Sequence, residues 1–389
     1  MNVVDDPIFQ QLIQDRGLKT ATIKSYQYAL SKFCKITNHT PTNLIEEAED
    51  EEDQNIRLRR RKITQYFHAF LKYLQELDHS YESIDKQISI IRTFYFHYDI
   101  ELPKKLKLKN EQSSELKIPS IDEIKFALKN SNPCFEAIIV LMCSSAMGRS
   151  EIINLTIQDM INSVSKYQKI SLDDLQDVGG MRKELLKNVE GPLTWKIRRI
   201  KTSFDYVTFS TPESLEYILL YLESKKPVQS FDDQLFMNKW GNPLTYKTFS
   251  QYFRDLNIRC GFGIQGRSIY FRSHNLRKWF AQQLENTTLG YMNTRRLMGH
   301  QVYDQTSRRY FKTNEEVLYN LYLDNMNVVS IFSNLQVFNH TSEEVKGLQE
   351  ELKRRDERDQ ARDEELRQMR KDLDRAMQIK IMEENLTKE

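Results

Sequence analysis

Between residues 8 and 100, hydrophobic positions recur at three- and four-residue intervals, most clearly over 23–33 and 66–74. This is the spacing of amphipathic helices, and it predicts a small helical N-terminal domain over 1–100. An acidic run from Glu46 to Asp53 is followed at once by the basic sequence RLRRRK. So sharp a change of charge predicts a solvated loop that enters a basic helix.

The helical pattern stops between 101 and 119, where prolines and closely spaced lysines replace the apolar periodicity. We interpret this segment as a basic interdomain linker. Ser120 then stands at the N-cap position of a new helix and opens a larger, mainly helical domain over 120–335. Inside it, LTWKIRRI and YVTFS alternate and are rich in strand-forming residues, which predicts a β-hairpin with its turn around 201–205. The expected fold class is mainly α with one small β-hairpin.

The segment 336–389 differs in composition from both domains. From Ser342 the chain is almost entirely Glu, Lys, Arg, Asp, Gln, Leu and Met. A heptad register fits seven apolar residues: Val345, Leu348, Leu352, Leu366, Met369, Leu373 and Ala376. Polar residues occupy three successive core positions in the middle of this register: Arg355, Asp359 and Arg362. The segment is therefore expected to be a long charged helix, either solvated on its own or part of an oligomerising coiled coil.

Composition narrows the class of protein. A chain of 389 residues with 39% hydrophobic residues can form two ordinary domains, which excludes a disordered chain. No stretch approaches the roughly 18 apolar residues of a membrane-spanning helix, and MNVVDDPIFQ is acidic where a signal peptide is basic, so a cytoplasmic protein is expected. The cysteines are widely spaced without a CxxC pair, and we expect small buried apolar residues rather than disulfide or zinc sites: Cys34, Cys134, Cys143 and Cys260.

The charge balance favours a polyanionic partner more than the net charge of +2 suggests. The segment 341–389 holds about 12 basic and 15 acidic residues, so the rest of the chain carries a net charge of about +5. The basic residues form three clusters that fit contacts with DNA phosphates: Arg59, Arg60, Arg61 and Lys62; Lys104 and Lys105; and Lys196, Arg198 and Arg199. For any one cluster alone, a solvated helix face or linker is the favoured interpretation.

Four segments between Cys143 and Phe311 carry the candidate chemistry: SSAMGRSEIINLTIQDM, WKIRRIKTSFDYVTFSTPES, SHNLRKWF and LMGHQVYDQTSRRYF, in that order. Displacement at a DNA phosphate needs a nucleophile, cations for two non-bridging oxygens and a proton for the leaving oxygen. Arg149 and Arg277 are candidates for the cations, because guanidinium binds phosphate through a planar fork. His274 precedes Arg277 by three residues, so the two share a face if the segment is helical.

No one of these motifs is specific, but their order and spacing are. Here the chain resembles the tyrosine recombinases, the lambda-integrase family of site-specific DNA recombinases, and most of all their archaeal integrases. The likeness covers about 120–332, and GLKTATIKSYQYALSKF is similar to the family's helical core-binding domain. The resemblance implies a helical core-binding domain followed by a tyrosine recombinase catalytic domain.

The resemblance also implies roles for individual residues. Lys201, at the hairpin turn, matches the lysine that protonates the leaving 5′ oxygen. His300 matches a second histidine that hydrogen-bonds the phosphate or the nucleophile. Tyr310, ten residues after His300, matches the nucleophile, which needs a cationic site because the pKa of free tyrosine is about 10. Tyr303 stands too close to His300 and is expected to be a packing residue.

One feature departs from the family pattern. Many relatives carry an acidic residue three places after the first arginine, whereas Glu151 follows Arg149 by two. The loop around Gly148 therefore differs by one residue from theirs, which bears on the orientation of Arg149.

The implied reaction is attack by Tyr310 on a scissile phosphate, giving a 3′-phosphotyrosyl link and a free 5′ hydroxyl that attacks a partner duplex. Such an exchange requires no nucleotide cofactor and no metal. The implied partner is double-stranded DNA at a specific attachment or recombination site, bound by a homo-tetramer in which a C-terminal helix docks on the neighbouring subunit. The amphipathic segment 312–332 is suitably placed for that contact, and a mobile-element integrase is favoured.

Two alternatives remain open at this stage. A type IB topoisomerase uses the same residue types to cut and reseal a single strand. A DNA-binding regulator with an integrase-like domain would bind without cleaving.

Overall fold

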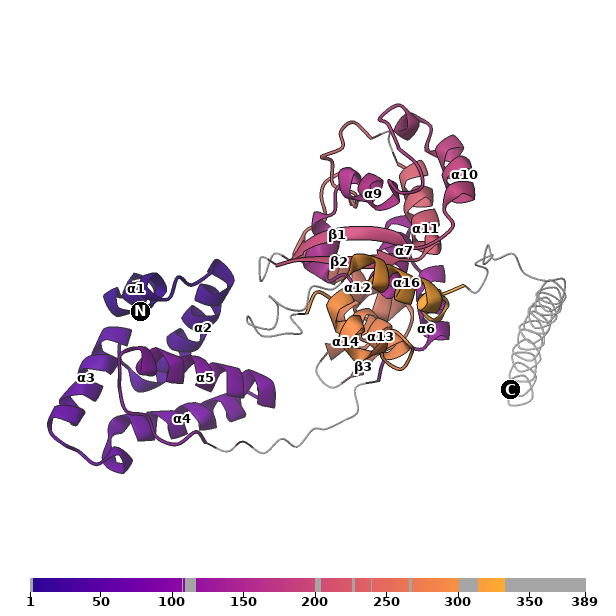
Figure 1. Cartoon of the computed structure of the whole chain (residues 1–389). Helices are drawn as coiled ribbons and strands as arrows, with labels where there is room; N and C mark the ends of the chain where they lie inside the picture. The colour runs from indigo at the N-terminus through magenta and orange to yellow at the C-terminus, as the bar shows by residue number, and fades with distance from the viewer. Residues whose placement is uncertain are drawn as a thin grey trace, which may run out of the picture. The chain divides into compact units, whose positions relative to one another are not determined.

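The computed structural model describes residues 3–106, 108, 117–199, 204–225, 228–238, 240–265, 268–300 and 314–332. The chain divides into two compact units, Met1–Lys117 with Ile264–Ser268, and Ile118–Gly263 with Ile269–Glu389 (Figure 1). The described residues are mainly helical with two small two-stranded sheets, which confirms the predicted fold class. Within those residues, no helix combines the length and apolar character needed to cross a membrane.

The described part of the first unit is a cluster of five α-helices. These are α1 (Pro7–Asp15), α2 (Thr20–Thr37), α3 (Pro41–Asp53), α4 (Lys62–Glu76) and α5 (Tyr81–His97), with 3-10 turns at Val3–Asp5 and Leu58–Arg60. Phe33 of α2 is fully buried at the centre, with ring centroids 5.2 Å from Phe70 of α4 and 6.2 Å from Tyr95 of α5. The apolar positions of these helices thus pack inward around aromatic edge contacts.

The acidic run from Glu46 to Asp53 lies in helix α3, so the predicted solvated loop is wrong. Thr40 caps α3, and three apolar side chains at helical spacing are buried: Leu44, Ile45 and Ala48. The basic segment that follows satisfies the carboxylates, since Glu51 accepts from the Lys62 N–H at 3.0 Å and Glu47 binds the Lys62 ammonium at 2.5 Å. Packing and pairing therefore outweigh the repulsion between neighbouring acids.

The second unit contains the remaining helices and the main hairpin. Its described elements are α6 (Ile121–Lys129), α7 (Pro133–Ser145), α8 (Arg149–Asn154), α9 (Ile157–Val164), α10 (Val178–Asn188), β1 (Leu193–Arg199), β2 (Phe204–Ser210), α11 (Pro212–Glu223), α12 (Tyr246–Arg259), α13 (Ser273–Glu285), α14 (Gly290–Leu297) and α16 (Glu315–Asn325). Short 3-10 turns lie at Asp174–Gln176 and Met326–Val329. The predicted N-cap Ser120 is confirmed, because it forms a capping box with Glu123.

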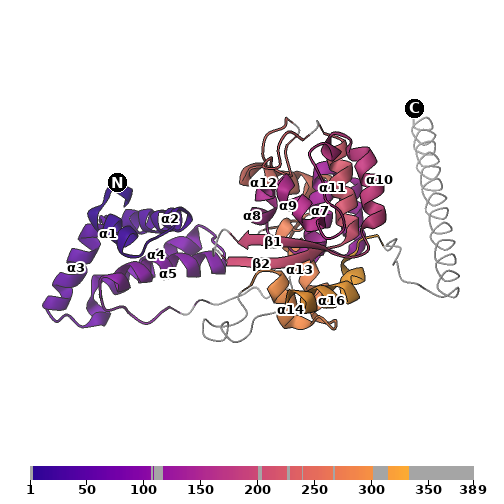
Figure 2. The ribbon, with the colours of Figure 1, turned by 45° about the horizontal axis from the view of Figure 1, so that its top comes forward.

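Strands β1 and β2 pair in antiparallel register, with Leu193 opposite Ser210 and Arg199 opposite Phe204. This confirms the predicted hairpin, although Phe204 and Asp205, expected in the turn, belong to β2. The hairpin lies between α9 on one side and α14 and α16 on the other (Figure 2). A second pair, β3 (Ile264–Gln265) and β4 (Ser268–Ile269), has two residues per strand, too few for an alternating pattern to reveal.

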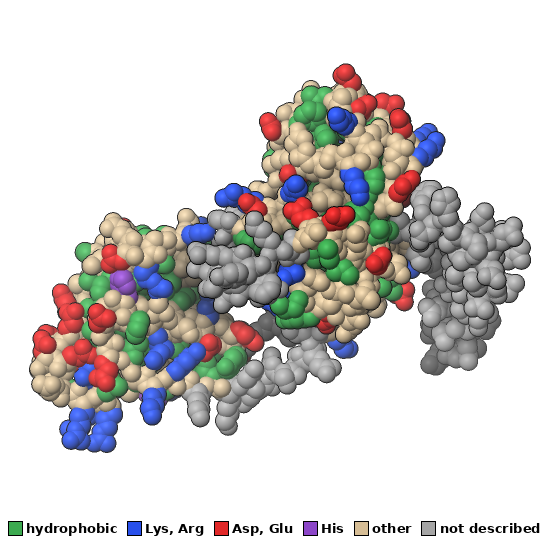
Figure 3. Space-filling model, in the orientation of Figure 1, with side chains coloured by type: hydrophobic (Ala, Val, Ile, Leu, Met, Phe, Trp, Pro, Cys, Tyr) green, Lys and Arg blue, Asp and Glu red, His purple; other side chains and the backbone are tan. Residues whose placement is uncertain are grey.

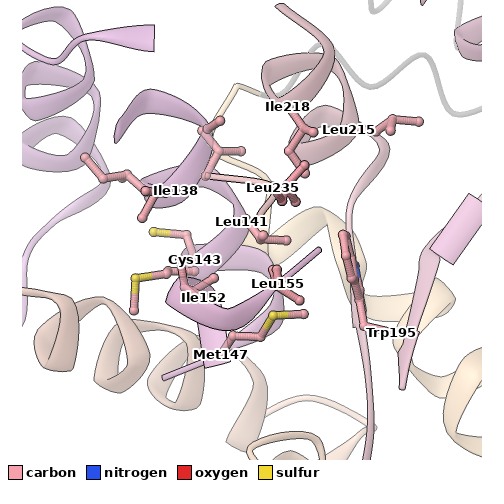
Figure 4. Packing of buried hydrophobic residues seen from close by; sticks show 14 of the residues in the cluster. Ile138, Leu141, Cys143, Met147, Ile152, Leu155, Trp195, Leu215, Ile218 and Leu235 are labelled. Carbon is pink, nitrogen blue, oxygen red and sulfur yellow. The ribbon is translucent and has the colours of Figure 1, made fainter. Parts of the chain in front are cut away.

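Helix α7 is the centre of the second unit. Its residues from Cys134 to Ser145 are all buried except the partly exposed Glu136, and it packs against α11, α13 and β2. Side chains from α8, β1 and α11 close over it (Figure 4). A helix that is apolar all round must be surrounded by protein, so the position of its C-terminal end is fixed from every side. Cys34, Cys134 and Cys143 are buried as predicted, whereas Cys260 is partly exposed.

The segment 314–332 packs on its own unit. In α16, Tyr322 is buried and donates a hydrogen bond to the Ser144 carbonyl at 2.6 Å. The buried Glu213 accepts from the backbone N–H groups of Ile331 and Phe332, each at 2.9 Å. Leu318 and Tyr322 of α16 are thus covered within the chain, whereas Val317 is 51% exposed. The predicted long helix over 336–389 lies outside the described residues, as do most of 107–116 in the linker.

Candidate active site

Arg277, on α13, lies in the interior of the second unit and is 7% exposed. Its guanidinium donates to two backbone carbonyls, that of Ala146 just beyond α7 and that of Met298 just beyond α14. Carbonyls at a helix C-terminus have no partner within the helix and carry partial negative charge, so the cation satisfies two helix ends at once. Burial lowers the pKa of Arg277, while Tyr206 and Glu151 raise it. The side chain remains a cation at neutral pH.

Glu151, in the first turn of α8, is a buried carboxylate between two arginines. It accepts a hydrogen bond from the Gly148 N–H at the N-terminus of α8. Its oxygens lie 3.8 Å from Arg277 Nη1 and 3.7 Å from Arg199 Nε. A buried carboxylate is stable only when paired, and here the two guanidiniums come from different elements, α13 and β1. Glu151 therefore fixes the distance between two cations.

The turn after α14 presents His300. Gly299 has a φ of +65°, and its N–H donates to the Arg296 carbonyl at 2.8 Å while the His300 N–H donates to the Arg295 carbonyl at 3.0 Å. These two bonds form a Schellman motif, which ends a helix with a left-handed glycine. Arg199 Nη1 donates to the Gly299 carbonyl at 2.7 Å. The Gly-His pair of the LMGH motif is thus a helix terminus tied to the end of β1.

The ring of Tyr206, on β2, packs against this turn. A Cβ added to Gly299 would lie 2.7 Å from a carbon of the Tyr206 ring, so the glycine is required by contact as well as by its φ. The hydroxyl of Tyr206 is buried beside the Arg277 guanidinium. Burial, with the negative charge of Glu151, raises its pKa, so the phenol is neutral at physiological pH.

His300 is a neutral imidazole in this environment. Burial, followed by the positive charges of Arg277, Arg295 and Arg199, lowers the pKa of His300 to about 4. Its Nδ1 is buried without a partner among the described residues. A neutral ring can donate one hydrogen bond and accept another, which suits a group that contacts a phosphate or a nucleophile.

Arg149 does not share these contacts. It is the first residue of α8 and is exposed, with Nη1 2.5 Å from the Ser250 hydroxyl and the guanidinium 4.8 Å from the centre of the Tyr246 ring, both on α12. Residues two apart on a helix point in nearly opposite directions, so Arg149 points away when Glu151 points inward. The two-residue spacing between Arg149 and Glu151 therefore directs their side chains to different sides of α8.

His274 lies one turn before Arg277 on α13, which confirms the predicted helix. The side chain of His274 is exposed, whereas that of Arg277 is buried. Partial burial, then the positive charges of Lys278, Arg272 and Arg277, lower the pKa of His274. It is therefore neutral at pH 7 and stands within the field of Arg277, as the shared face of the helix predicts.

Three predicted positions lie outside the described residues: Lys201, Tyr303 and Tyr310. The structure describes the chain on both sides of Lys201, where β1 ends at Arg199 and β2 begins at Phe204. It likewise describes His300 before Tyr310 and Asn314 after it. The roles of these three residues stay predictions.

The basic residues predicted to bind DNA fall into different environments. Arg61 is 8% exposed and binds Glu52 at 2.6 Å, Glu101 at 3.3 Å and the Ile56 carbonyl at 2.8 Å. We therefore assign Arg61 to the internal packing of the first unit rather than to phosphate contact.

The other members of these clusters are more accessible. Seven are exposed: Arg59, Arg60, Lys62, Lys104, Lys105, Lys196 and Arg198. Three of these pair with acids at the surface, Lys62 with Glu47, Lys105 with Asp85 at 2.7 Å and Arg198 with Asp205 at 3.9 Å. On the face shown in Figure 3, acidic and basic side chains are interspersed in each unit.

Sequence reasoning missed Tyr206 and did not place Arg199 in the site. A signal for both exists in the hairpin, because period-two alternation puts Arg199 on the same side of β1 as the buried Trp195 and Ile197. Tyr206 faces Ile197 across the pair. An arginine at an inward-facing strand position needs a partner, and Glu151 supplies it. Among the described residues, no group of three His, Cys, Asp or Glu side chains could hold a metal ion.

Known proteins resemble this chain in sequence and in fold. Residues 121–316, about half of the chain, match the phage integrase family. No curated protein matches the chain. The integrase of transposon Tn1549 in complex with circular intermediate DNA has a similar structure, with 13% identity, a TM-score of 0.50, and coverage of 81% of this chain and 96% of that one.

Two further solved structures are also similar. The XerH site-specific recombinase bound to difH substrate is 15% identical, with a TM-score of 0.47 and coverage of 80% and 82%. A lambda integrase dimer bound to a COC' core site is 14% identical, with a TM-score of 0.48 and coverage of 86% and 96%. At these identities the likeness concerns the fold alone.

Proposed function

The chain belongs to the phage integrase family of tyrosine recombinases, and from that premise we propose that it is a site-specific recombinase that cleaves and rejoins duplex DNA through a 3′-phosphotyrosyl intermediate. The observation that carries the proposal is the cluster of Arg277, Glu151, Arg199 and His300. Four elements distant in sequence bring these groups together around one buried cation. Guanidinium and neutral imidazole are the groups that stabilise a phosphate undergoing displacement.

In the proposed reaction, Tyr310 attacks the scissile phosphate and the 5′ oxygen departs with a proton from Lys201. Arg277 and a second guanidinium neutralise the non-bridging oxygens, while His274 and His300 hydrogen-bond the phosphate or the nucleophile. The phosphotyrosine conserves the energy of the broken bond, so the released 5′ hydroxyl can reseal it on a partner duplex. The cations of the site also favour the tyrosinate over the phenol.

The partner in this proposal is double-stranded DNA at an attachment or recombination site. Exposed basic residues of the first unit, Arg59, Arg60 and Lys104, would contact the backbone, as would Lys196 and Arg198 on the outward face of β1. We further propose a role in integrating or excising a mobile element, of the archaeal type that the sequence resembles, with a homo-tetramer assembled on DNA.

Covalent capture tests the function on many candidate DNA sites at once. The full chain is incubated, without added metal, with a pool of nicked duplexes of random core sequence, and adducts that survive denaturation are recovered and sequenced. We expect an enriched sequence and a phosphotyrosyl adduct that Tyr310→Phe abolishes and the matched control Tyr303→Phe retains.

Three other results would contradict the proposal. An adduct that persists in Tyr310→Phe would refute the assigned nucleophile. Sequence-specific binding without any adduct would indicate a regulator that does not cleave. Cleavage that always reseals the same strand, with no exchange between two labelled duplexes, would indicate a topoisomerase.

A further inference from the structure

We propose that Arg199, at the end of β1, is the second arginine that binds the scissile phosphate, in the place that the sequence pattern gives to Arg149. The inference rests on the proposed strand-transfer function and assigns one residue within it. It follows from which of the two arginines the fold brings to Arg277.

Arg149 is held away from Arg277 by the geometry of α8. Glu151 uses the inward side of this short helix, and its carboxylate reaches Arg277 Nη1 at 3.8 Å. Arg149, two residues earlier, leans on α12, where Ser250 and Tyr246 hold its guanidinium. To reach the phosphate bound by Arg277, Arg149 would have to leave both contacts and turn around the helix.

Arg199, unlike Arg149, lies beside the Glu151 carboxylate that pairs with Arg277. It shares the Glu151 carboxylate with Arg277, at 3.7 Å from Nε, and its Nη1 donates to the carbonyl of Gly299, the residue before His300. It also stands two residues before Lys201 in sequence. Arg199 therefore contacts the carboxylate that also pairs with Arg277 and the residue that precedes His300, and it comes from the inward face of its strand.

The donors of Arg199 suit a ligand. Contacts within the described part of the chain engage Nε and Nη1, which leaves the two N–H groups of Nη2 for an incoming oxygen. The Arg199 side chain is 24% exposed, compared with 9% for that of Arg277, so Arg199 is the more accessible of the two guanidiniums.

The charge of the cluster also fits a phosphodiester. Two guanidiniums and one carboxylate carry a net charge of +1, and a phosphodiester carries −1. Glu151 thus holds the two cations together in the absence of DNA and orients them before substrate binds, which is the condition for electrostatic catalysis. With Arg277 alone, the Glu151 carboxylate would cancel the only cation of the cluster.

The test must separate phosphate binding by Arg199 from a role in holding the Gly299–His300 turn. We compare Arg199→Ala, Arg149→Ala, Arg277→Ala and the surface control Arg182→Ala, which removes an arginine paired with Glu223 at 3.1 Å on α11. Each is assayed for the rate of covalent adduct formation on two substrates. One carries the natural scissile phosphate, and the other an uncharged methylphosphonate at the same position.

We expect Arg199→Ala to lower the rate on natural DNA by about 10²–10³-fold, the usual cost of removing one donor to a developing oxyanion. Its rate relative to wild type should recover at least tenfold on the methylphosphonate, because that substrate has no charge for the arginine to neutralise. Arg277→Ala should respond in the same direction. Arg149→Ala and Arg182→Ala should show no preference for the neutral substrate beyond that of wild type.

Other outcomes would overturn the assignment. Equal losses on both substrates for Arg199→Ala would make Arg199 a positioning residue for His300. Recovery of Arg149→Ala by methylphosphonate would return the role to Arg149. If Arg199→Ala does not fold, Arg199→Lys carries the test, since it keeps the charge without the planar fork and should lose rate on natural DNA but not on the neutral substrate. Absence of any adduct from the wild-type protein on a verified binding site would refute the proposed function itself.

Discussion

Replacing Gly299 with alanine tests the packing that presents His300. At this position the added Cβ would meet three ring carbons of Tyr206 at 2.7, 2.8 and 2.9 Å, and the residue has a φ of +65°. The left-handed conformation costs an alanine about 1 kcal/mol, and overpacking a buried site costs about 1–3 kcal/mol more. Gly290 provides a matched control, because its φ is +73° but nothing lies within 4 Å of an added Cβ. Gly290→Ala should therefore show only the conformational cost.

The assay is thermal unfolding of the full chain followed by tryptophan fluorescence. All three tryptophans, Trp195, Trp240 and Trp279, lie in the second unit, so the signal reports that unit alone. A difference of about 1–3 kcal/mol between the variants corresponds to a melting temperature about 3–9 °C lower for Gly299→Ala, at about 3 °C per kcal/mol for a domain of this size. Equal melting temperatures would refute the contact with Tyr206. Adding Tyr206→Leu should abolish most of the difference, since it removes the ring that the methyl group meets.

Three further predictions concern pH and packing. The pKa of His300 is lowered in the folded state to about 4, so as the pH falls the unfolded chain takes up this proton first. The stability that His300 contributes is therefore present above pH 6.5 and is lost as the pH falls toward 4. Between these pH values, the midpoint of urea unfolding should depend less on pH in His300→Gln than in the wild type, and an equal pH dependence would contradict the shift. Arg61→Ala should destabilise the first unit by about 1–2 kcal/mol in calorimetry, because it removes the hydrogen bonds of a buried guanidinium to the Ile56 carbonyl and Glu52. The exposed Arg59→Ala should leave the unfolding temperature unchanged and reduce the salt dependence of DNA binding by about one ion; equal melting temperatures would argue against the assignment of Arg61. Ser120→Ala removes the cap of α6 and should cost about 1 kcal/mol in tryptophan-detected unfolding, while Ser120→Asp should retain most of the stability and a loss as large as that of alanine would contradict the cap.

Much of the fold follows from the sequence by local rules. The spacing of Phe33 and Phe70 with their apolar neighbours predicts the helices of the first unit, because a helix must bury one face. Alternation in LTWKIRRI predicts β1, and Ser120 predicts the start of α6. The acidic run before residue 54 shows where charge alone misleads, since the acids of α3 find their partners at Lys62 and Arg61 only after the chain has turned back.

The sequence predicts the residue types of the candidate site, and the structure brings some of the predicted residues together but not Arg149. Sequence order and spacing identify Arg277, His274 and His300, because each lies in a motif whose local structure is a helix or a helix end. They cannot tell whether Arg149 or Arg199 accompanies Arg277, since that depends on which guanidinium reaches the Glu151 carboxylate across the unit. Local periodicity gives each side chain a direction on its own element. Only the packing of α7, α8, α13 and the β1–β2 hairpin decides which of those directions converge, because a buried charge is stable only where the fold supplies its counter-charge.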